Sequence, residues 1–148
     1  MNLVKCLPIP SKERLMSLQE FTLRSHRRTE LIDITAPLAE RVRQSQVASG
    51  LLIVYVPHTT AAVTINENAD PSVTHDFLAE LERLVPQEGT YLHAEGNSPA
   101  HVKSSLVGSS QNLFIEESQL VLGTWQGVFF CEFDGPRSRK VRIKILPG

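Results

Sequence analysis

The feature that most restricts the fold of this chain is the close spacing of two strand-like segments near its middle. Residues 51–56 are apolar or aromatic at every position, which is typical of a strand buried on both faces. A second strand-like segment, residues 61–67, begins just after Pro57 and His58. This link is too short for the crossover helix that joins parallel strands. We therefore predict that the two segments are antiparallel neighbours.

The rest of the chain reads as strands that enclose helical segments. Strands are predicted in residues 21–25, 31–34, 113–116, 119–122, 124–133 and 141–146. One helix is predicted from Thr35, with Pro37 in its first turn, Leu38, Val42 and Val47 on its apolar face, and a stop at Gly50. This order predicts a single α+β domain rather than alternating βαβ units.

Two further helices are marked by a capping residue followed by proline. Asp70-Pro71 begins a helix that runs to Pro86, and its apolar stripe comprises Val73, Phe77, Leu81 and Leu84. Ser98-Pro99 begins a shorter helix that ends at Gly108, with Val102 and Leu106 predicted as its core contacts.

Composition argues against several classes of protein. The net charge of −1 provides no field to attract nucleic acid or an anionic membrane. No apolar stretch is long enough to span a bilayer, and no glycine-rich nucleotide loop is present. The two cysteines, Cys6 and Cys131, are far apart, which excludes a cysteine-based zinc site and fits a reducing, cytoplasmic location. The basic stretch 137–144 is interpreted as an exposed edge strand.

Several polar residues lie at positions that core packing does not need. In the strand 61–67 and just beyond it, Thr64, Asn66 and Asn68 share one face. Glu67 falls on the apolar side, where a carboxylate needs a partner, unless the strand has already ended and Glu67 is in solvent. In residues 124–133, Trp125, Phe129, Cys131 and Phe133 are predicted to face the core, whereas Thr124, Gln126 and Glu132 share the other face.

The two later helices also carry polar side chains outside their apolar stripes. His75 and Asp76 flank the stripe of the first, either as a site wall or subunit interface near the helix N-terminus or as an ordinary solvated face. On the second, His101 and Ser105 share a face, and Lys103 and Ser104 lie elsewhere. These groups near a helix N-terminus suit a phosphate or another oxyanion, although a solvated polar helix explains them equally well.

Four of the five histidines lie between residues 58 and 101. A single histidine is more often a hydrogen-bonded structural residue than a metal ligand. Several near predicted element ends favour a metal site, yet no fixed motif such as H-E-x-x-H is present.

Four motifs, taken in order, resemble the YjbQ family. They are residues 58–62 (HTTAA), residues 64–71 (TINENADP), Glu95-Gly96-Asn97 with residues 100–106 (AHVKSSL), and residues 123–126 (GTWQ) followed by Glu132 and residues 134–137 (DGPR). The resemblance covers residues 19–148 and leaves residues 1–18 as an N-terminal extension.

The resemblance implies a two-layer sandwich of mainly antiparallel strands with two to three helices, assembled as a homotrimer with a site near the subunit boundary. It also implies a divalent metal, zinc or magnesium, with His58, His93 and His101 as its ligands. The catalytic candidates that follow from it are Glu67, Asp76, Lys103 and Glu132. The substrate-binding candidates are Asn66, Asn68, Ser104, Ser105, Thr124 and Gln126. His75 is a weaker candidate, because the family accepts other residues there.

The activity that the resemblance implies is a secondary thiamine-phosphate synthase, which joins a pyrimidine methyl diphosphate to a thiazole phosphate and releases diphosphate. A cation-assisted departure of the anionic leaving group suits Lys103, a helix N-terminus and a metal. Two alternatives stay open. One is a metal-dependent hydrolase with Glu67 or Asp76 as general base. The other is a non-catalytic trimer that binds a phosphorylated metabolite.

Overall fold

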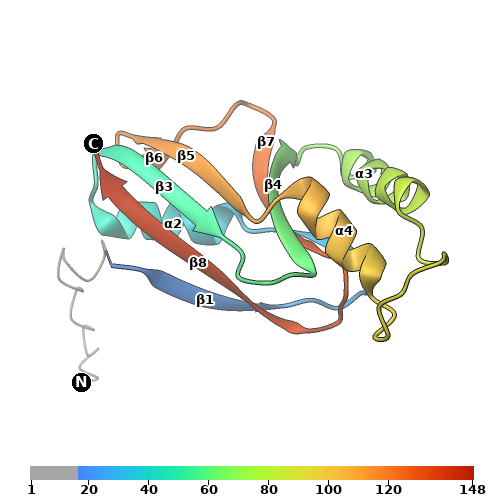
Figure 1. Ribbon diagram of the computed structural model, residues 1–148. Coiled ribbons are helices and arrows are strands. Elements are labelled where there is room, and N and C mark those ends of the chain that lie inside the picture. The colour runs from blue at the N-terminus through green and yellow to red at the C-terminus, as the bar shows by residue number, and fades with distance from the viewer. Residues whose placement is uncertain (1–16) are drawn as a thin grey trace, which may run out of the picture.

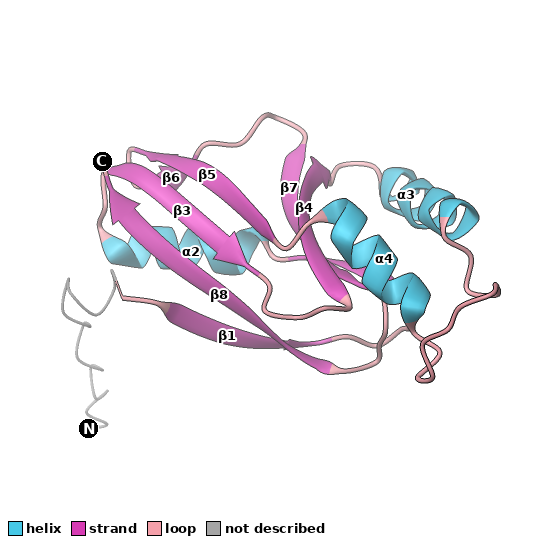
Figure 2. Ribbon diagram, in the orientation of Figure 1, coloured by secondary structure: helices cyan, strands magenta, loops and turns pink. Residues whose placement is uncertain are grey.

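The computed structural model describes residues 17–148, so most of the predicted N-terminal extension lies outside the described residues. Two antiparallel sheets and three helices form the described part of the chain (Figures 1 and 2). The five-stranded sheet has the order β1-β8-β3-β5-β6 and the three-stranded sheet the order β2-β7-β4. The strands are β1 Gln19–Arg24, β2 Glu30–Asp33, β3 Ser49–Tyr55, β4 Ala61–Glu67, β5 Ser110–Glu116, β6 Gln119–Leu120, β7 Gln126–Glu132 and β8 Ser138–Pro147. The helices are α2 Thr35–Ser45, α3 Pro71–Leu84 and α4 Ser98–Val107. The predicted α+β class is confirmed.

The prediction that the two central segments pair with each other is wrong. β3 lies between β8 and β5, whereas β4 pairs with β7 in the other sheet. The short link is a corner between the sheets. On either side of it, Val56 N–H donates to Ser109 O at 2.8 Å and Val63 N–H donates to Gly108 O at 3.0 Å. A link of this length can form either a hairpin or a corner between two sheets. The spacing of the strands in the sequence therefore does not distinguish a hairpin from a corner.

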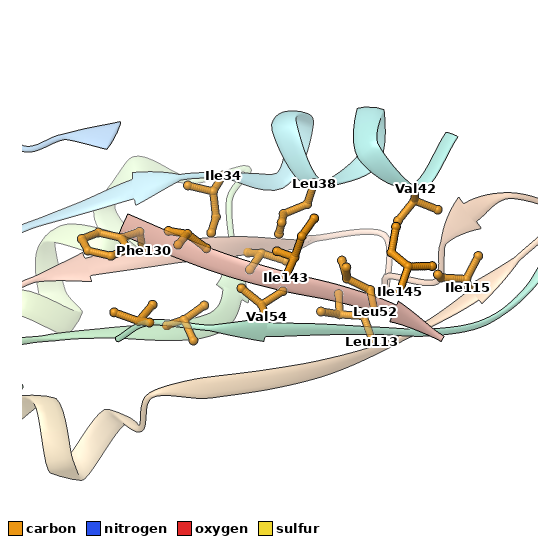
Figure 3. Close-up of a cluster of buried hydrophobic side chains, with 14 of the residues drawn as sticks. Ile34, Leu38, Val42, Leu52, Val54, Leu113, Ile115, Phe130, Ile143 and Ile145 are labelled. Atoms are coloured by element: carbon orange, nitrogen blue, oxygen red, sulfur yellow. The ribbon is translucent and has the colours of Figure 1, made fainter. Parts of the chain in front are cut away.

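The main core fills the space between the five-stranded sheet and a layer formed by α2 and the three-stranded sheet. Its members include Leu38 and Val42 of α2, Leu52 and Val54 of β3, and Phe130 of β7, all fully buried (Figure 3). A second, smaller cluster lies on the opposite face of the three-stranded sheet, beneath α3 and α4, and contains Ala62, Leu81, Ala100, Cys131 and Phe133. β7 is therefore buried on both faces, and this explains its nearly continuous apolar sequence.

The helix ends agree with the sequence at α3 and differ at α2. Asp70 caps α3 as predicted, because its Oδ1 accepts the N–H of Ser72 at 2.8 Å. Thr35 does not cap α2; it is the first helical residue, and its hydroxyl accepts the N–H of Val128 at 2.9 Å. α2 also ends before Gly50, at Gln46 in the left-handed conformation.

The predicted core face of α4 is wrong. Val102 and Leu106 are exposed, whereas Ala100, Lys103 and Ser104 are buried. Small residues let the helix approach β4 closely, and Ser104 Oγ donates to Ala61 O at 2.6 Å. Lys103 is buried because its ammonium reaches Glu82 of α3. A pattern of apolar residues cannot reveal a helix that packs through small and paired polar side chains.

Two other burial predictions are corrected. The basic stretch is not an edge strand, because β8 lies between β1 and β3. Its cations have specific partners: Arg139 pairs with Glu132, and Lys140 and Arg142 pair with Glu20. Trp125 precedes β7 and is 63% exposed, so it is not a core residue.

None of the helices in residues 17–148 has the length and apolar character needed to cross a membrane.

Candidate functional site

The predicted site residues separate to opposite ends of the three-stranded sheet. β4 and β7 are antiparallel, so Ala61 pairs with Glu132 at one end and Glu67 pairs with Gln126 at the other. Six residue steps of about 3.3 Å each separate these ends by about 20 Å along β4. Within one protomer, the histidine end and the amide end therefore cannot contribute to the same small cavity.

The histidine end contains two adjoining cavities that share His58, Thr59 and His101. The first, about 300 Å³, is named here the α4 cavity; it is lined by Pro57, His58, Thr59, Thr60, Glu95, Asn97, His101, Asp134, Arg137 and Arg139. The second, about 500 Å³, is lined by His58, Thr59, His101, Ser104, Ser105, Gly108 and Ser109. Imidazole, guanidinium, amide and carboxylate groups thus meet beside the first turn of α4.

His58 is held by the backbone of β8. Its Nε2 accepts the N–H of Lys140 at 2.8 Å, which requires Nε2 to be unprotonated. Burial, followed by the cation of Arg139, holds the pKa of His58 below its ordinary value. The neutral ring therefore carries its proton on Nδ1, and His58 is a hydrogen-bond donor through that nitrogen.

Arg139 is fixed by a buried ion pair with Glu132. Arg139 Nε donates to Glu132 Oε2 at 2.8 Å, and Nη2 donates to Glu132 Oε1 and to Thr60 Oγ1. The carboxylate also accepts Ser25 Oγ at 2.8 Å and the N–H of Asp134 at 2.9 Å. Glu132 is fully buried and does not line the cavity. The carboxylate of Glu132 therefore fixes the position of Arg139 through Nε and Nη2. Nη1 of Arg139 takes no part in these hydrogen bonds.

Opposing effects set the pKa of Glu132. Burial by itself raises the pKa of this carboxyl, but the hydrogen bonds from Arg139, from Asp134 N–H and from Ser25 outweigh burial and hold the pKa below its ordinary value. Glu132 is consequently an ionised counterion at neutral pH.

The loop after β7 brings Asp134 and Arg137 to the same cavity. Arg137 Nη2 donates to Asp134 Oδ2 at 2.8 Å, and Asn97 Nδ2 donates to the same oxygen at 3.0 Å. The loop needs glycine at position 135, because a Cβ there would lie 2.3 Å from Arg27 O and 2.7 Å from Ser25 Oγ. Gly135 thus lets the loop pack closely against Ser25, whose hydroxyl donates to Glu132.

Of the three predicted metal ligands, His93 lies beside His101 and His58 lines the same cavities as His101, but the three do not form a metal-binding group within this protomer. The rings of His93 and His101 are 5.4 Å apart between centroids, and His93 Nε2 lies 3.7 Å from Glu95 Oε2. His58 has its Nε2 occupied by the Lys140 N–H. Across the part of the chain that the structure describes, no group of three or more histidine, cysteine, aspartate or glutamate side chains is placed to hold an ion. Within one protomer, these side chains as placed do not hold an ion without a change in side-chain position.

The predicted residues on α4 are held by the protein itself. Lys103 Nζ pairs with Glu82, and this partner lowers the pKa of the Glu82 carboxyl. Ser104 Oγ donates to Ala61 O, and Ser105 Oγ donates to His101 O at 2.9 Å. Lys103 lines neither cavity, whereas Ser104 and Ser105 line the larger one.

The amide end of the sheet forms its own cluster. Asn66 Oδ1 accepts the N–H of Glu67 at 2.8 Å, and Asn68 Nδ2 donates to Asp33 Oδ2 at 3.4 Å. Gln126 Oε1 accepts the N–H of Gly123 at 2.8 Å, beside the exposed Thr124. Asp76 belongs to neither end: it is exposed on α3, and its Oδ1 lies 3.1 Å from His75 Nδ1.

Of the ten residues that line the α4 cavity, sequence reasoning included only His58 and His101 among its candidates, and it did not include the polar residues Asn97, Asp134, Arg137 and Arg139. Asn97, Asp134 and Arg137 lie within the motifs that carry the family resemblance, and this signal could have identified them. Arg139 was assigned to an edge strand, and only the pairing of β8 with both neighbours reveals its buried position.

The comparisons with known proteins agree with this fold. The sequence profile of the YjbQ family, described as "UPF0047 protein YjbQ-like", matches residues 19–148. UPF0047 protein MJ1081 of Methanocaldococcus jannaschii is 50% identical over 129 residues, covering 87% of this chain and 94% of that protein. UPF0047 protein YugU of Bacillus subtilis is 46% identical over 130 residues, covering 87% of this chain and 98% of that protein.

Solved structures extend the agreement to three dimensions. A YjbQ/UPF0047 protein of Clostridium acetobutylicum is 52% identical with a TM-score of 0.85, covering 86% of this chain and 99% of that chain. A Sulfolobus solfataricus protein, described as YbjQ-like and of unknown function, is 29% identical with a TM-score of 0.85, covering 89% and 97%. These relatives carry no assigned reaction in their descriptions. By sequence and by fold, this chain belongs to the YjbQ (UPF0047) family.

Proposed function

We propose that the chain is a small-molecule enzyme that binds a phosphorylated metabolite in the α4 cavity, with thiamine-phosphate synthesis as a secondary activity. The observation that carries the proposal is that Arg137, Arg139, His58 and His101 line one cavity at the N-terminus of α4. No side chain caps that helix end. Guanidinium groups beside the positive end of a helix dipole favour a phosphate or diphosphate.

The proposed reaction needs stabilisation of a departing anion rather than a nucleophilic side chain. A nitrogen lone pair of the thiazole phosphate forms a bond to the methylene carbon of the pyrimidine. The C–O bond to diphosphate breaks, and its electron pair leaves with the diphosphate. Arg139 is held in place by Glu132, so its orientation requires no reorganisation when charge develops on the leaving oxygen. His58, neutral and protonated on Nδ1, supplies a further donor.

A direct assay tests the proposal. Purified protein is incubated with pyrimidine methyl diphosphate and thiazole phosphate, and thiamine phosphate and diphosphate are both quantified. His101 lines the same cavity as Arg139 and His58, and we propose that its ring is a third donor to the departing diphosphate. We expect His101→Ala to reduce the rate by about 100-fold or more, since donors to a leaving group typically contribute that much. His26→Ala is the matched control, because His26 is exposed and does not line the α4 cavity.

The outcomes separate the competing functions. No thiamine phosphate at any substrate concentration removes the synthase activity. Diphosphate release without the thiazole substrate favours a hydrolase instead, and saturable binding with no turnover favours a binding protein. Equal rates for His101→Ala and His26→Ala contradict the location of the site.

We retain a divalent metal, zinc or magnesium, as a prediction for this end of the sheet, with His58, His93 and His101 as its ligands. No step of the proposed reaction depends on it. Elemental analysis of the purified protein, compared with the His93→Ala and His101→Ala variants, tests the prediction. Metal content that is unchanged in both variants contradicts it.

We also expect the protein in the cytoplasm, which cell fractionation tests.

We further propose a homotrimer that assembles through the outer face of the five-stranded sheet. Leu51 pairs with Phe114 on one side and with Leu146 on the other, which forms an apolar row across three strands. Phe114 is 67% exposed, and Tyr55 extends the row along β3 at 44%. Such a patch is typical of a protein–protein contact. Phe114→Glu should lower the mass measured by analytical ultracentrifugation from three chains to one without loss of folding. A wild-type monomer contradicts the proposal.

A further inference from the structure

Asn97 is at the N-cap of α4, yet its side chain does not cap the helix. Asparagine is favoured at this position because its Oδ1 can accept an N–H of the first turn. Here the amide is turned toward the loop after β7, where Nδ2 donates to Asp134 Oδ2 at 3.0 Å. Asp134 is in turn held by Arg137. The Asn97 side chain therefore contacts the loop beside the α4 cavity and does not cap the helix.

The Oδ1 of Asn97 is buried and has no hydrogen-bond donor among residues 17–148. It is the one buried side-chain oxygen or nitrogen of the described residues in this condition. The amide orientation is determined, because rotation by 180° would place Oδ1 against the carboxylate of Asp134. Asn97 is 8% exposed, and a buried acceptor without a donor destabilises a fold. Such a group calls for a donor that the chain itself does not provide.

We propose that Asn97 determines specificity by accepting a hydrogen bond from an N–H or O–H group of the ligand. This inference rests on the proposed function, since it takes the α4 cavity as the site of the phosphorylated ligand. Asn97 lines that cavity together with Arg137 and Arg139. The ligand class is thus a small phosphorylated molecule that has an amino or hydroxyl donor near its anionic group.

Among the substrates of the proposed reaction, an aminopyrimidine methyl diphosphate has this combination. Its diphosphate meets the guanidinium groups, and its exocyclic amino group supplies the donor. A site with a committed buried acceptor discriminates strongly, because a ligand without the donor leaves that acceptor unpaired.

Calorimetric titration with three probes tests the inference. The probes are inorganic diphosphate, the aminopyrimidine methyl diphosphate and an analogue in which hydrogen replaces the amino group. We expect the wild-type protein to prefer the amino compound by about tenfold, the effect of one hydrogen bond in a buried site. Asn97→Ser should remove this preference and leave diphosphate affinity within about twofold, since serine still suits an N-cap. Gln44→Ser, which replaces an exposed amide on α2 away from both the α4 cavity and the outer face of the five-stranded sheet, is the control and should retain the preference.

The results distinguish the inference from the proposed function. Failure of diphosphate to bind the wild-type protein removes the anion site, and the role of Asn97 with it. If diphosphate binds but the wild-type protein does not distinguish the two pyrimidines, the inference alone is overturned. The same holds if Asn97→Ser retains the preference. Should Asn97→Ser fail to fold, the wild-type comparison still decides.

Discussion

Arg139→Met is the substitution whose effect follows most directly from the contacts described above. It removes a guanidinium that donates to both oxygens of Glu132 and to Thr60 Oγ1. Methionine occupies a similar volume, so little cavity is created. Glu132 remains fully buried and keeps its bonds from Ser25 and Asp134 N–H, but loses its only charged partner among the described residues.

The expected loss of stability is large for one substitution. Removing one partner of a buried ion pair costs about 3–5 kcal/mol, because the remaining charge is uncompensated. A domain of ordinary stability, about 5–15 kcal/mol, should still fold with this loss. The assay is urea denaturation followed by circular dichroism. Arg142→Met is the matched control on the same strand, and its partner Glu20 is at the surface, so the loss of stability there should be much smaller than in Arg139→Met.

The pH dependence provides a second, sharper test. In the wild-type protein the pKa of Glu132 is lowered, so its contribution is present above the unfolded pKa and is lost only as pH falls through the folded value. In Arg139→Met, burial is no longer opposed by the cation, and the pKa of Glu132 rises. The variant then gains stability relative to wild type as pH falls from 7 to 5, by at most about 1.4 kcal/mol per pH unit. A destabilisation below about 1 kcal/mol, or one independent of pH, would refute the reasoning.

Three further predictions use the same measurements. NMR titration should give His58 a pKa below its ordinary value, and its contribution to stability should fall as pH drops from the unfolded pKa through the folded pKa. The pKa of His58 should rise in Arg139→Met, because the nearby guanidinium charge that lowers it is removed. An unshifted pKa for His58 in the wild-type protein contradicts this. Lys103→Met should cost less than about 1 kcal/mol, because Glu82, with 49% of its side chain exposed, can be hydrated without its partner; a loss as large as that of Arg139→Met would show that Glu82 depends on the pair. Gly135→Ala should destabilise by about 2 kcal/mol or more, since its Cβ meets backbone at 2.3 Å, whereas Gly123→Ala meets only the flexible Gln126 side chain at 3.3 Å; equal unfolding midpoints for the two variants contradict the close approach.

Local chemistry in the sequence was sufficient to predict the elements. Alternation predicted β1, continuous apolar residues predicted β3, and Asp70-Pro71 predicted the start of α3, because each signal depends on residues only a few positions apart. The four family motifs likewise identified the family. They also contained His58, Asn97 and His101, which the fold brings to one cavity.

The tertiary structure decided which strands pair and which side chains are buried. Whether the link after β3 forms a hairpin or a corner depends on which strands are available as partners, and β7 and β8 lie more than sixty positions away in the sequence. For the same reason, Arg139 read as a surface cation until β8 was placed between β1 and β3 beside Glu132. α4 buries Lys103 and exposes Leu106 because Glu82 and Ala61 are its neighbours, and no local pattern contains them. A sequence determines what each segment can form, whereas the free energy of burying a polar group depends on partners that only the folded chain supplies.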